Sequence, residues 1–254
     1  MPPRLIGMVH LGPLPGSPSP WQLDSVIERA VADAATIQEA GFDALLVENY
    51  GDTPFFGTLV PPITVAAMTR AVSAVRDVAR VPVGVNVLRN DSLAALGIAA
   101  ATGSAFIRVN VLAGVMLTDQ GIIEGRAAEL ARERARLEPS VEIYADVLVK
   151  HAMPAPGVSQ EQAAEDTWTR AGADALILTG SGTGRSVDLA EVRTVHELLP
   201  DAPLIVGSGV SPETVAEILS VANGVIVGTA IKEEGVTSAP VSRQRAEALV
   251  TAAA

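Results

Sequence analysis

The sequence contains no cysteine among its 254 residues. Disulfide bonds, thiolate catalysis and cysteine-ligated metal sites are therefore excluded. Aromatic residues make up only 3% of a chain that is 48% hydrophobic, so its core must consist of Ala, Val, Leu and Ile. Such a core is typical of strands that are buried on both faces and surrounded by alanine-rich helices.

Three further absences or shortages bear on location and partners. No apolar run reaches the length that spans a membrane, because Leu93–Ile107 is interrupted by small and polar residues. The segment Met1–Arg4 leads directly into a strand-like run and lacks the features of a signal peptide. Basic residues are few, 18 against 29 acidic ones, and the net charge of −11 argues against nucleic-acid binding. We expect a cytoplasmic protein without membrane insertion.

A short apolar run recurs eight times in the chain, and a helical pattern follows each run. The runs are Leu5–Val9, Ala44–Val47, Val83–Val87, Ala105–Val109, Val141–Val147, Ala175–Leu178, Leu204–Val206 and Gly224–Val227. Alternation of strand and helix predicts a parallel sheet, and eight units predict its closure. The chain also has the length of one such barrel. We therefore expect a single (β/α)8 barrel domain over residues 1–254.

Helix boundaries and loop lengths distinguish the two ends of this barrel. Candidate N-caps are Ser25, Asp91, Asp119, Ser159, Asp188 and Ser211, while Gly41, Gly103 and Gly172 are candidate helix ends. The long links all follow strands: Leu11–Trp21, Asn49–Pro62, Val111–Thr118, Met153–Val158 and Gly180–Val187. Active sites of this fold lie on the strand-to-helix loops, so we expect the site at that end.

A ring of polar side chains is predicted at the carboxyl ends of the strands. Period-two spacing places Phe106, Arg108 and Asn110 on one face of their strand. The same phase in the other strands gives what we call the strand-end ring: His10, Glu48, Asn86, Arg108, Asn110, Asp146 and Thr179. Strand ends are often polar because they meet water, but two carboxylates, an Arg and a His together favour a functional site.

Further cations are expected near this ring. Arg89, Lys150 and Lys232 map to the same end of the barrel and, with Arg108, form a positive island suited to an anionic ligand. His151 adjoins Lys150 and is a candidate substrate contact. By topology, Arg108 and Lys150 are the expected partners of the two carboxylates.

Two glycine loops follow the last two expected strands, where barrels commonly bind phosphate through backbone N–H groups. The candidate phosphate-binding residues are Gly207, Ser208, Gly209, Gly228 and Thr229. A helix start at Ser211 follows the first of these loops. A third glycine run, Gly180–Gly184, could cover a bound ligand or simply connect two elements.

Several motifs resemble the BtpA/SgcQ family along essentially the whole chain. They are Ile6-Gly-Met-Val-His10, Leu14-Pro-Gly-Ser-Pro18, Val47-Glu-Asn-Tyr-Gly-Asp52, Gly84-Val-Asn-Val-Leu-Arg-Asn-Asp91, Phe106-Ile-Arg-Val-Asn110, Asp119-Gln-Gly-Ile-Ile-Glu-Gly125, Ala145-Asp146 with Val149-Lys-His151, Gly207-Ser-Gly209 and Val227-Gly-Thr229 with Lys232. Tyr50 stands where the family suggests Phe, and Ser19-Pro20-Trp21 where it suggests an Arg and an aromatic. These departures concern the rim of the expected site, so they bear on its specificity more than on activity. The resemblance implies a ribulose-phosphate-binding-type barrel, in a family whose members are named for photosystem I biogenesis or described as predicted barrel enzymes or nucleosidases.

The residues support an enzyme that acts on a small phosphorylated sugar or nucleotide-like compound, as a lyase, isomerase or hydrolase. Glu48, Asp146 and His10 would be catalytic, with the two carboxylates serving catalysis and not stability. Lys150 is either a Schiff-base amine or a cation that binds substrate. The expected substrate contacts are Asn86, Arg89, Arg108, Asn110, His151 and Thr179. No cofactor is identified and no metal ligand is assigned, while a divalent metal between the two carboxylates is left open.

The alternative is a non-catalytic assembly or stability factor for a membrane complex, built on the same scaffold. It predicts a degenerate strand-end ring and an apolar patch on the outside of the protein. The ring residues are all present in the sequence, which favours the enzyme. In either case we expect a homo-oligomer.

Overall fold

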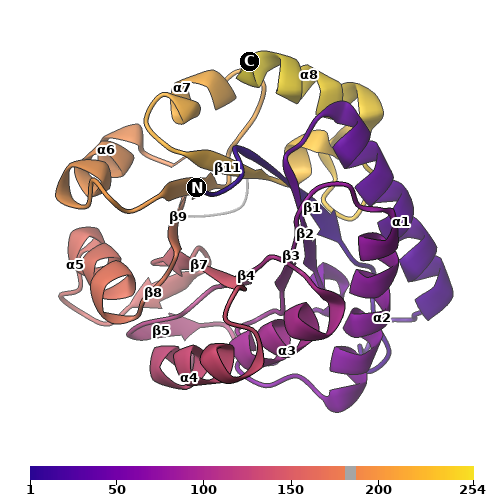
Figure 1. The fold of residues 1–254 in the computed structure, drawn as a ribbon, viewed down its shortest axis with the longest axis horizontal. Helices are drawn as coiled ribbons and strands as arrows, with labels where there is room; N and C mark the ends of the chain where they lie inside the picture. Colours follow the sequence, from indigo (N-terminus) through magenta and orange to yellow (C-terminus); the bar gives the residue numbers. More distant parts are fainter. Residues whose placement is uncertain (181–186) are drawn as a thin grey trace.

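The computed structural model describes residues 1–180 and 187–254 and has the predicted barrel. Eight parallel strands close in the order β1-β11-β10-β9-β7-β4-β3-β2 (Figure 1). Their bounds are β1 Leu5–His10, β2 Ala44–Glu48, β3 Val83–Asn86, β4 Phe106–Val109, β7 Glu142–Val147, β9 Ala175–Thr179, β10 Leu204–Gly207 and β11 Gly224–Val227. Every predicted run is confirmed to within one residue at each end.

The two faces of the barrel strands bury different sets of side chains. The inside is filled by a cluster of buried residues: Ile6, Met8, Ala44, Leu46, Phe106, Tyr144, Ala175, Ile177, Ile205 and Ile226. Phe106 and Tyr144 stack there with their ring centroids 4.6 Å apart. Gly84 leaves the room for this, since a Cβ at that position would lie 2.2 Å from the Phe106 ring. This cluster confirms the predicted phase, and it forms the floor beneath the strand-end ring.

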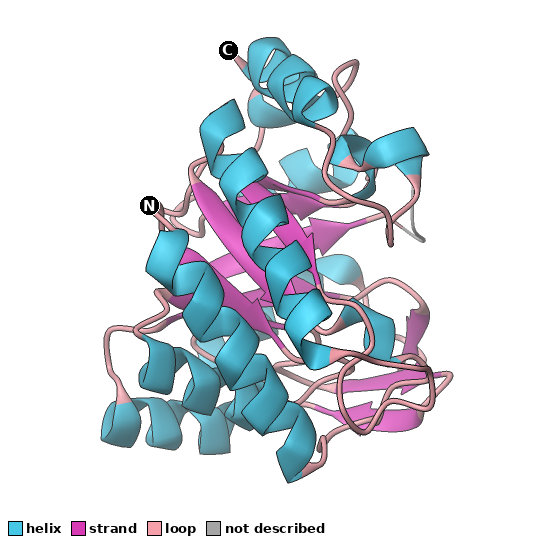
Figure 2. Cartoon of the chain, turned by 90° about the vertical axis from the view of Figure 1, so that its right-hand side faces the viewer, coloured by secondary structure: helices cyan, strands magenta, loops and turns pink. Residues whose placement is uncertain are grey.

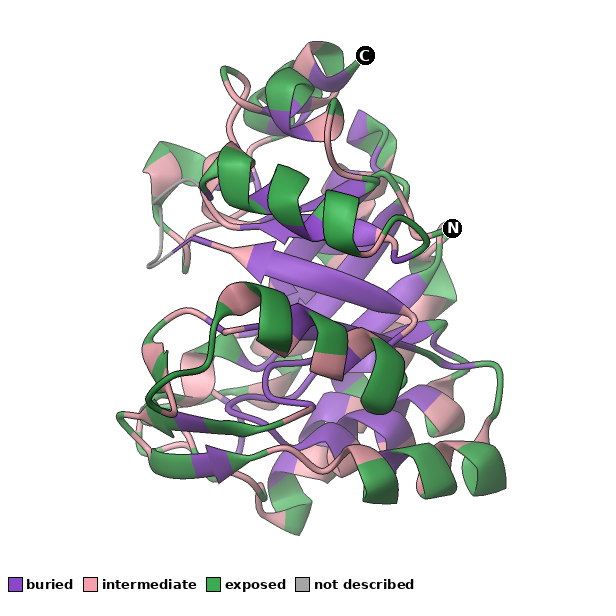
Figure 3. Ribbon diagram, turned by 90° about the vertical axis from the view of Figure 1, so that its left-hand side faces the viewer, coloured by how far each residue is buried: buried purple, intermediate pink, exposed green. Residues whose placement is uncertain are grey.

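Helices cover the outer faces of the strands, and they expose their own outer sides (Figure 3). They are α1 Leu23–Ala40, α2 Pro62–Val78, α3 Ser92–Thr102, α4 Ala127–Leu137, α5 Gln160–Glu165, α6 Leu189–Leu198, α7 Val215–Leu219 and α8 Arg243–Ala253. Alternate strand residues such as Leu45, Val85 and Ile107 are buried in the core beneath these helices. No helix of the described residues is long and apolar enough to cross a membrane.

The predicted helix starts are confirmed in part. Asp91, Ser159 and Asp188 are N-caps whose side chains accept hydrogen bonds from backbone N–H groups of the first turn. Ser25 lies inside α1, which begins two residues earlier, because Gln22 already has the extended conformation of an N-cap. Ser211 begins a turn, and α7 starts only at Val215.

A small antiparallel sheet was not predicted from the sequence. It consists of β5 Val115–Thr118, β6 Gly121–Glu124 and β8 Ala152–Pro154, in the order β6-β5-β8 (Figure 2). Asp119 therefore lies in a tight hairpin turn instead of capping a helix, and two of the expected long loops contain strands. The third expected glycine loop, Gly180–Gly184, lies outside the described residues beyond Gly180.

Candidate functional site

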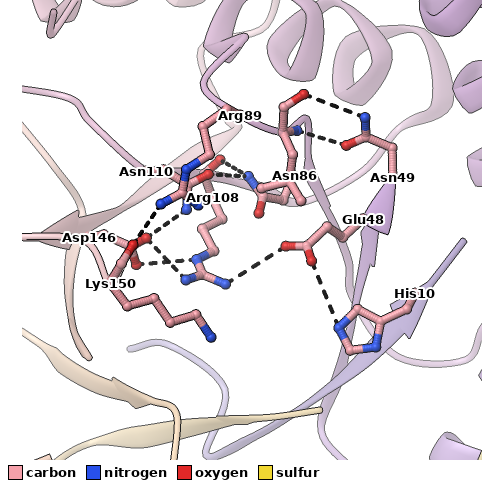
Figure 4. Close-up of polar contacts among 10 residues, drawn as sticks. His10, Glu48, Asn49, Asn86, Arg89, Arg108, Asn110, Asp146 and Lys150 are labelled. Carbon is pink, nitrogen blue, oxygen red and sulfur yellow. Dashed lines mark hydrogen bonds and ion pairs between the residues drawn. The ribbon is translucent and has the colours of Figure 1, made fainter. Parts of the chain in front are cut away.

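The strand-end ring lies at the carboxyl end of the barrel, and its members follow one another around the strands. The register pairs His10 with Glu48, Glu48 with Asn86, and Asn86 with Arg108 on neighbouring strands. Because paired residues of parallel strands point to the same side, these side chains meet inside the barrel mouth. Figure 4 shows them converging.

Asp146 and Arg108 form the most tightly bonded part of the ring. Arg108 donates from Nε and Nη2 to the two carboxylate oxygens of Asp146, at 3.2 and 3.0 Å. Asn110 Nδ2 donates to the same carboxylate at 2.7 Å. Asn86 in turn donates to Asn110 Oδ1 at 3.1 Å and to the Arg108 carbonyl. The Asp146 side chain is fully buried and its oxygens are occupied, so its geometry is that of a group that orients Arg108.

Glu48 is held much more loosely than Asp146. Its oxygens lie 3.8 Å from His10 Nε2 and 3.9 Å from Arg108 Nη1, and they accept no hydrogen bond among the described residues. Burial raises the pKa of Glu48, against the opposing effect of Arg108 and Lys150. Glu48 is thus a carboxyl group with free lone pairs and a pKa shifted toward the range of acid–base catalysts.

His10 lies beside Glu48 as a neutral imidazole. Burial, assisted by Lys232, Lys150 and Arg108, lowers the pKa of His10 to about 3. The His10–Glu48 contact is therefore not an ion pair at neutral pH. The ring of Tyr50 covers His10, with the two centroids 5.0 Å apart. The sequence pattern did not assign Tyr50 to the site, although its place two residues after Glu48 was a usable signal.

Three buried polar atoms of the ring have no hydrogen-bond partner among the described residues. They are His10 Nδ1, Asn86 Oδ1 and Thr179 Oγ1, which come from three different strands. Buried polar atoms in native proteins are nearly always satisfied, and an exception calls for an explanation such as a ligand. These orphaned atoms mark the barrel mouth as a place where a polar molecule would complete the network.

Three further predicted residues lie on the loops around the ring. Arg89 is buried, and its Nη2 donates to the backbone carbonyl of Lys150 at 2.6 Å. Lys150 follows β7, and its ammonium has no hydrogen bond and no carboxylate within 4 Å among the described residues. The expected pairing of Lys150 with Glu48 or Asp146 is therefore wrong at the level of direct contact. His151 is exposed at the rim.

The glycine loops lie at the ends of β10 and β11. Ser208 and Gly209 both have positive φ, at 110° and 67°, so the chain turns sharply after Gly207. Gly228 lies against His10, where an added Cβ would come within 2.9 Å of the imidazole. Thr229 begins a 3-10 turn, and its hydroxyl contacts that of Thr237 at 2.9 Å. One loop thus directly adjoins the strand-end ring.

Lys232 is not available to an anionic ligand, contrary to the sequence-based interpretation, although its charge still helps to lower the pKa of His10. Its side chain is fully buried, and Nζ donates to Asp33 of α1 at 2.8 Å. Asp33 also accepts hydrogen bonds from Val241 N and Arg29 Nε. Lys232 is therefore a structural ion-pair partner that ties the segment after β11 to α1.

The geometry gives no support to a metal centre between the carboxylates. Within residues 1–180 and 187–254, no three His, Asp or Glu side chains are grouped so that they could hold a metal ion. Asp146 uses both carboxylate oxygens for Arg108, and Asn110 bonds one of them again.

Comparison with known proteins agrees with this architecture. The model of the BtpA family matches residues 2–254. An uncharacterised protein of Pyrococcus horikoshii is 50% identical over 96% of this chain and 93% of its own length. The photosystem I biogenesis protein BtpA of Synechocystis is 43% identical over 98% and 88%. The putative sgc region protein SgcQ of Escherichia coli is 33% identical over 91% and 87%.

Solved structures share the fold at low sequence identity. A thiamine phosphate pyrophosphorylase from Pyrococcus furiosus has a TM-score of 0.63 and 16% identity, over 98% of this chain and 95% of that one. A phosphoribosyl anthranilate isomerase from Thermus thermophilus has a TM-score of 0.62 and 14% identity, over 98% and 97%. The fold is thus one used by enzymes, and the sequence match to the family model runs over nearly the full length. The chain belongs to the BtpA family.

Proposed function

We propose that this protein is an enzyme that uses Glu48 for acid–base catalysis on a small phosphorylated sugar or nucleotide-like compound. The observation that carries the proposal is a set of polar groups in the barrel mouth that have no hydrogen-bond partner among the described residues. Glu48 accepts no hydrogen bond, and buried polar atoms of His10, Asn86 and Thr179 have no partner among the described residues. A polyhydroxylated ligand would satisfy these groups, whereas a scaffold without a ligand leaves them orphaned.

The ring residues then divide into two kinds. Glu48 and the adjacent His10 would contact the reacting part of the substrate. Asp146 would act as a positioning residue, because both of its carboxylate oxygens accept hydrogen bonds from Arg108 and so orient that side chain. Asn110 and Asn86 extend that bonded network toward the ligand. This is a revision of the expectation that both carboxylates are catalysts.

The phosphate would bind between the loops at Gly207–Gly209 and Gly228–Thr229. Two observations support this position. Gly228 adjoins His10, which brings the loop within reach of a ligand in the ring. In addition, two structural neighbours with this fold are named for phosphate-bearing substrates, a thiamine phosphate and a phosphoribosyl compound. The cytoplasmic location and the homo-oligomeric state stay predictions.

The substrate can be found by comparing metabolites of a strain with and without the gene. An enzyme of this kind should cause one phosphorylated compound to accumulate on deletion, and the purified protein should convert that compound. If no phosphorylated compound changes and none binds to the purified protein, the proposal is wrong. A positive result supplies the ligand for the following measurement.

Replacing Gly209 by leucine should weaken binding of the phosphorylated ligand at least tenfold by calorimetry. The added side chain enters a loop that must approach a phosphate closely, and left-handed φ adds about 1 kcal/mol of strain. The matched control is Gly103→Leu, since Gly103 has φ 65° against 67° for Gly209 and ends α3 at the opposite end of the barrel. Equal affinity of the two variants would remove the phosphate site from the proposal.

A second candidate function, an assembly factor for a membrane complex, is favoured by one feature of the surface. The outer face of the small sheet has a row of exposed apolar side chains: Ile122, Leu117 and Met153 lie directly across from one another, 65%, 46% and 70% exposed. Exposed apolar patches often mark protein-binding surfaces. A relative at 43% identity is named for photosystem I biogenesis, which is consistent with such a role.

Complementation of a deletion strain separates the two functions. For the enzyme, we expect the double variant Ile122→Glu/Met153→Glu to restore growth and Glu48→Gln to fail, since the row lies outside the barrel. An assembly factor would give the reverse pattern. Val236→Glu is a control for a new surface charge, because Val236 is 49% exposed elsewhere on the chain. Exposed substitutions of this kind usually change stability by less than about 0.5 kcal/mol.

A further inference from the structure

Lysine is almost absent from this chain, which makes the position of each lysine informative. Of the 18 basic residues, 16 are arginines and two are lysines, Lys150 and Lys232. Arginine therefore supplies nearly every positive charge of the protein. Lys232 is committed to a buried ion pair with Asp33. Lys150 is the remaining primary amine apart from the N-terminus, and it stands at the barrel mouth, where an arginine would supply charge equally well.

The backbone around Lys150 holds this side chain in a defined place. Leu148 and His151 both have left-handed φ, at 50° and 59°, which is unfavourable for residues with side chains. Val149 is buried in the core of the small sheet, and the Lys150 carbonyl accepts a hydrogen bond from Arg89. Backbone in an unfavourable conformation that neighbouring contacts hold in place is a frequent feature of active sites.

The amine itself is left without a partner. Figure 4 shows the Lys150 side chain extending away from its own backbone, with its amine beneath the Arg108 guanidinium. No carboxylate lies within 4 Å of its Nζ among the described residues, and residues 181–186 contain neither Asp nor Glu. A lysine that served as a structural cation would have a counter-charge, as Lys232 has. Lys150 has none.

The surroundings favour the neutral, nucleophilic form of this amine. Burial, and after it the charge of Arg108, lowers the pKa of Lys150. Glu48 and Asp146 oppose this shift, and Arg89 adds a smaller lowering effect. Desolvation beside a second cation is the usual way in which a protein activates a lysine. Glu48, whose pKa is raised by burial, is a proton donor in the same mouth.

We propose that Lys150 forms a Schiff base with the carbonyl group of a phosphorylated aldose or ketose, with Glu48 moving the protons. This inference rests on the proposed function, because it names the substrate class of the same site. It selects one of the two roles considered for Lys150 and accounts for a lysine where the chain otherwise uses arginine. It also predicts that the substrate carries a free or ring-opened carbonyl group.

The step balances without a further reactant. The Nζ lone pair attacks the carbonyl carbon, a C–N bond forms, and the π electrons of the C=O bond move to oxygen, which takes a proton from the Glu48 carboxyl group. Nitrogen returns a proton to Glu48, giving a carbinolamine. Glu48 then protonates the hydroxyl group, the C–O bond breaks and water leaves, while the nitrogen lone pair forms the C=N bond. The neutral amine, the Glu48 carboxyl group and the carbonyl compound thus become a protonated imine, the Glu48 carboxylate and water.

Reductive trapping tests this directly, because the chain has only two lysines. The full-length protein is incubated at neutral pH with pyridoxal 5′-phosphate or with glycolaldehyde phosphate, reduced with borohydride, and mapped by mass spectrometry. We expect one adduct on Lys150, formed faster than on the same lysine in the denatured chain, since a lowered pKa raises the neutral fraction of the amine at neutral pH. Glu48→Gln should slow the reaction, and Lys150→Arg should abolish it with unchanged melting temperature.

The outcomes separate this inference from the proposed function. If both phosphates stabilise the protein against heat but neither labels Lys150 faster than in the denatured chain, the Schiff base is wrong and the phosphate site stands. If unphosphorylated pyridoxal labels Lys150 as fast as the phosphate ester, and Gly209→Leu changes nothing, the Schiff base stands and the phosphate site is wrong. Preferential labelling of the N-terminal amine or of Lys232 would overturn the assignment to Lys150.

Discussion

Replacement of Asp33 by alanine should lower the free energy of unfolding by about 3–5 kcal/mol, the typical result of removing one partner of a buried ion pair. Asp33 is 3% exposed and accepts hydrogen bonds from Lys232 Nζ at 2.8 Å, Val241 N at 2.8 Å and Arg29 Nε at 3.1 Å. Its loss leaves a fully buried ammonium and a buried N–H group without a partner. Urea unfolding followed by circular dichroism measures the change.

Two variants show whether the buried charge causes this loss. Arg29→Ala removes the half-exposed partner and should change the free energy of unfolding by at most about 1 kcal/mol, as surface ion pairs do. The double variant Asp33→Leu/Lys232→Met removes both charges and should recover part of the stability, because well-packed apolar residues can replace a buried pair. If Asp33→Ala and Arg29→Ala behave alike, Lys232 is not the buried cation that the hydrogen bonding implies.

Glu48→Gln should reduce kcat/KM roughly 10²- to 10⁴-fold, the range associated with one acid–base group. The variant should keep or raise the melting temperature at neutral pH. Burial raises the Glu48 pKa in the folded protein, so the folded state holds this proton more strongly and loses stability as pH rises through that pKa. Glutamine removes the buried charge, and the Glu48 side chain has no hydrogen bond to lose within the described part of the chain. Steady-state kinetics and thermal unfolding measure the two effects.

Asp146→Asn is the matched comparison. Asp146 holds Arg108 with two hydrogen bonds inside the barrel, so its neutralisation should destabilise the protein by about 3 kcal/mol or more and also reduce activity.

The pH profile adds a second readout for Glu48. If it acts as a base, kcat/KM should fall on the acid side with an inflection above the ordinary glutamate pKa of 4.5. A Glu48→Gln variant with full activity, or one as unstable as Asp146→Asn, would contradict the acid–base role.

Within the barrel, local sequence determines the strands and the phase of their side chains. An apolar run of three to seven residues between a helix end and a polar loop defines a buried strand, and the period of two then decides which side chains face inward. For this reason Phe106, Arg108 and Asn110 could be placed on one face from the sequence alone, and the buried cluster under the strand-end ring follows the same phase. Gly41 and Gly103 end helices in left-handed conformations for equally local reasons.

The tertiary structure decides which charged groups meet, since partner choice depends on register and burial between residues far apart in the chain. Arg108 pairs with Asp146 across neighbouring strands, and no other residue that the structure describes donates a hydrogen bond to the Glu48 carboxyl group. Lys232 is 199 residues from Asp33 and is buried against it, although its sequence position suggested the barrel mouth. Lys150 has no ion pair within residues 1–180 and 187–254. The small sheet likewise depends on a long-range pairing, in which Leu117 of β5 lies opposite Met153 of β8, beyond β7. No local pattern in either segment specifies this pairing.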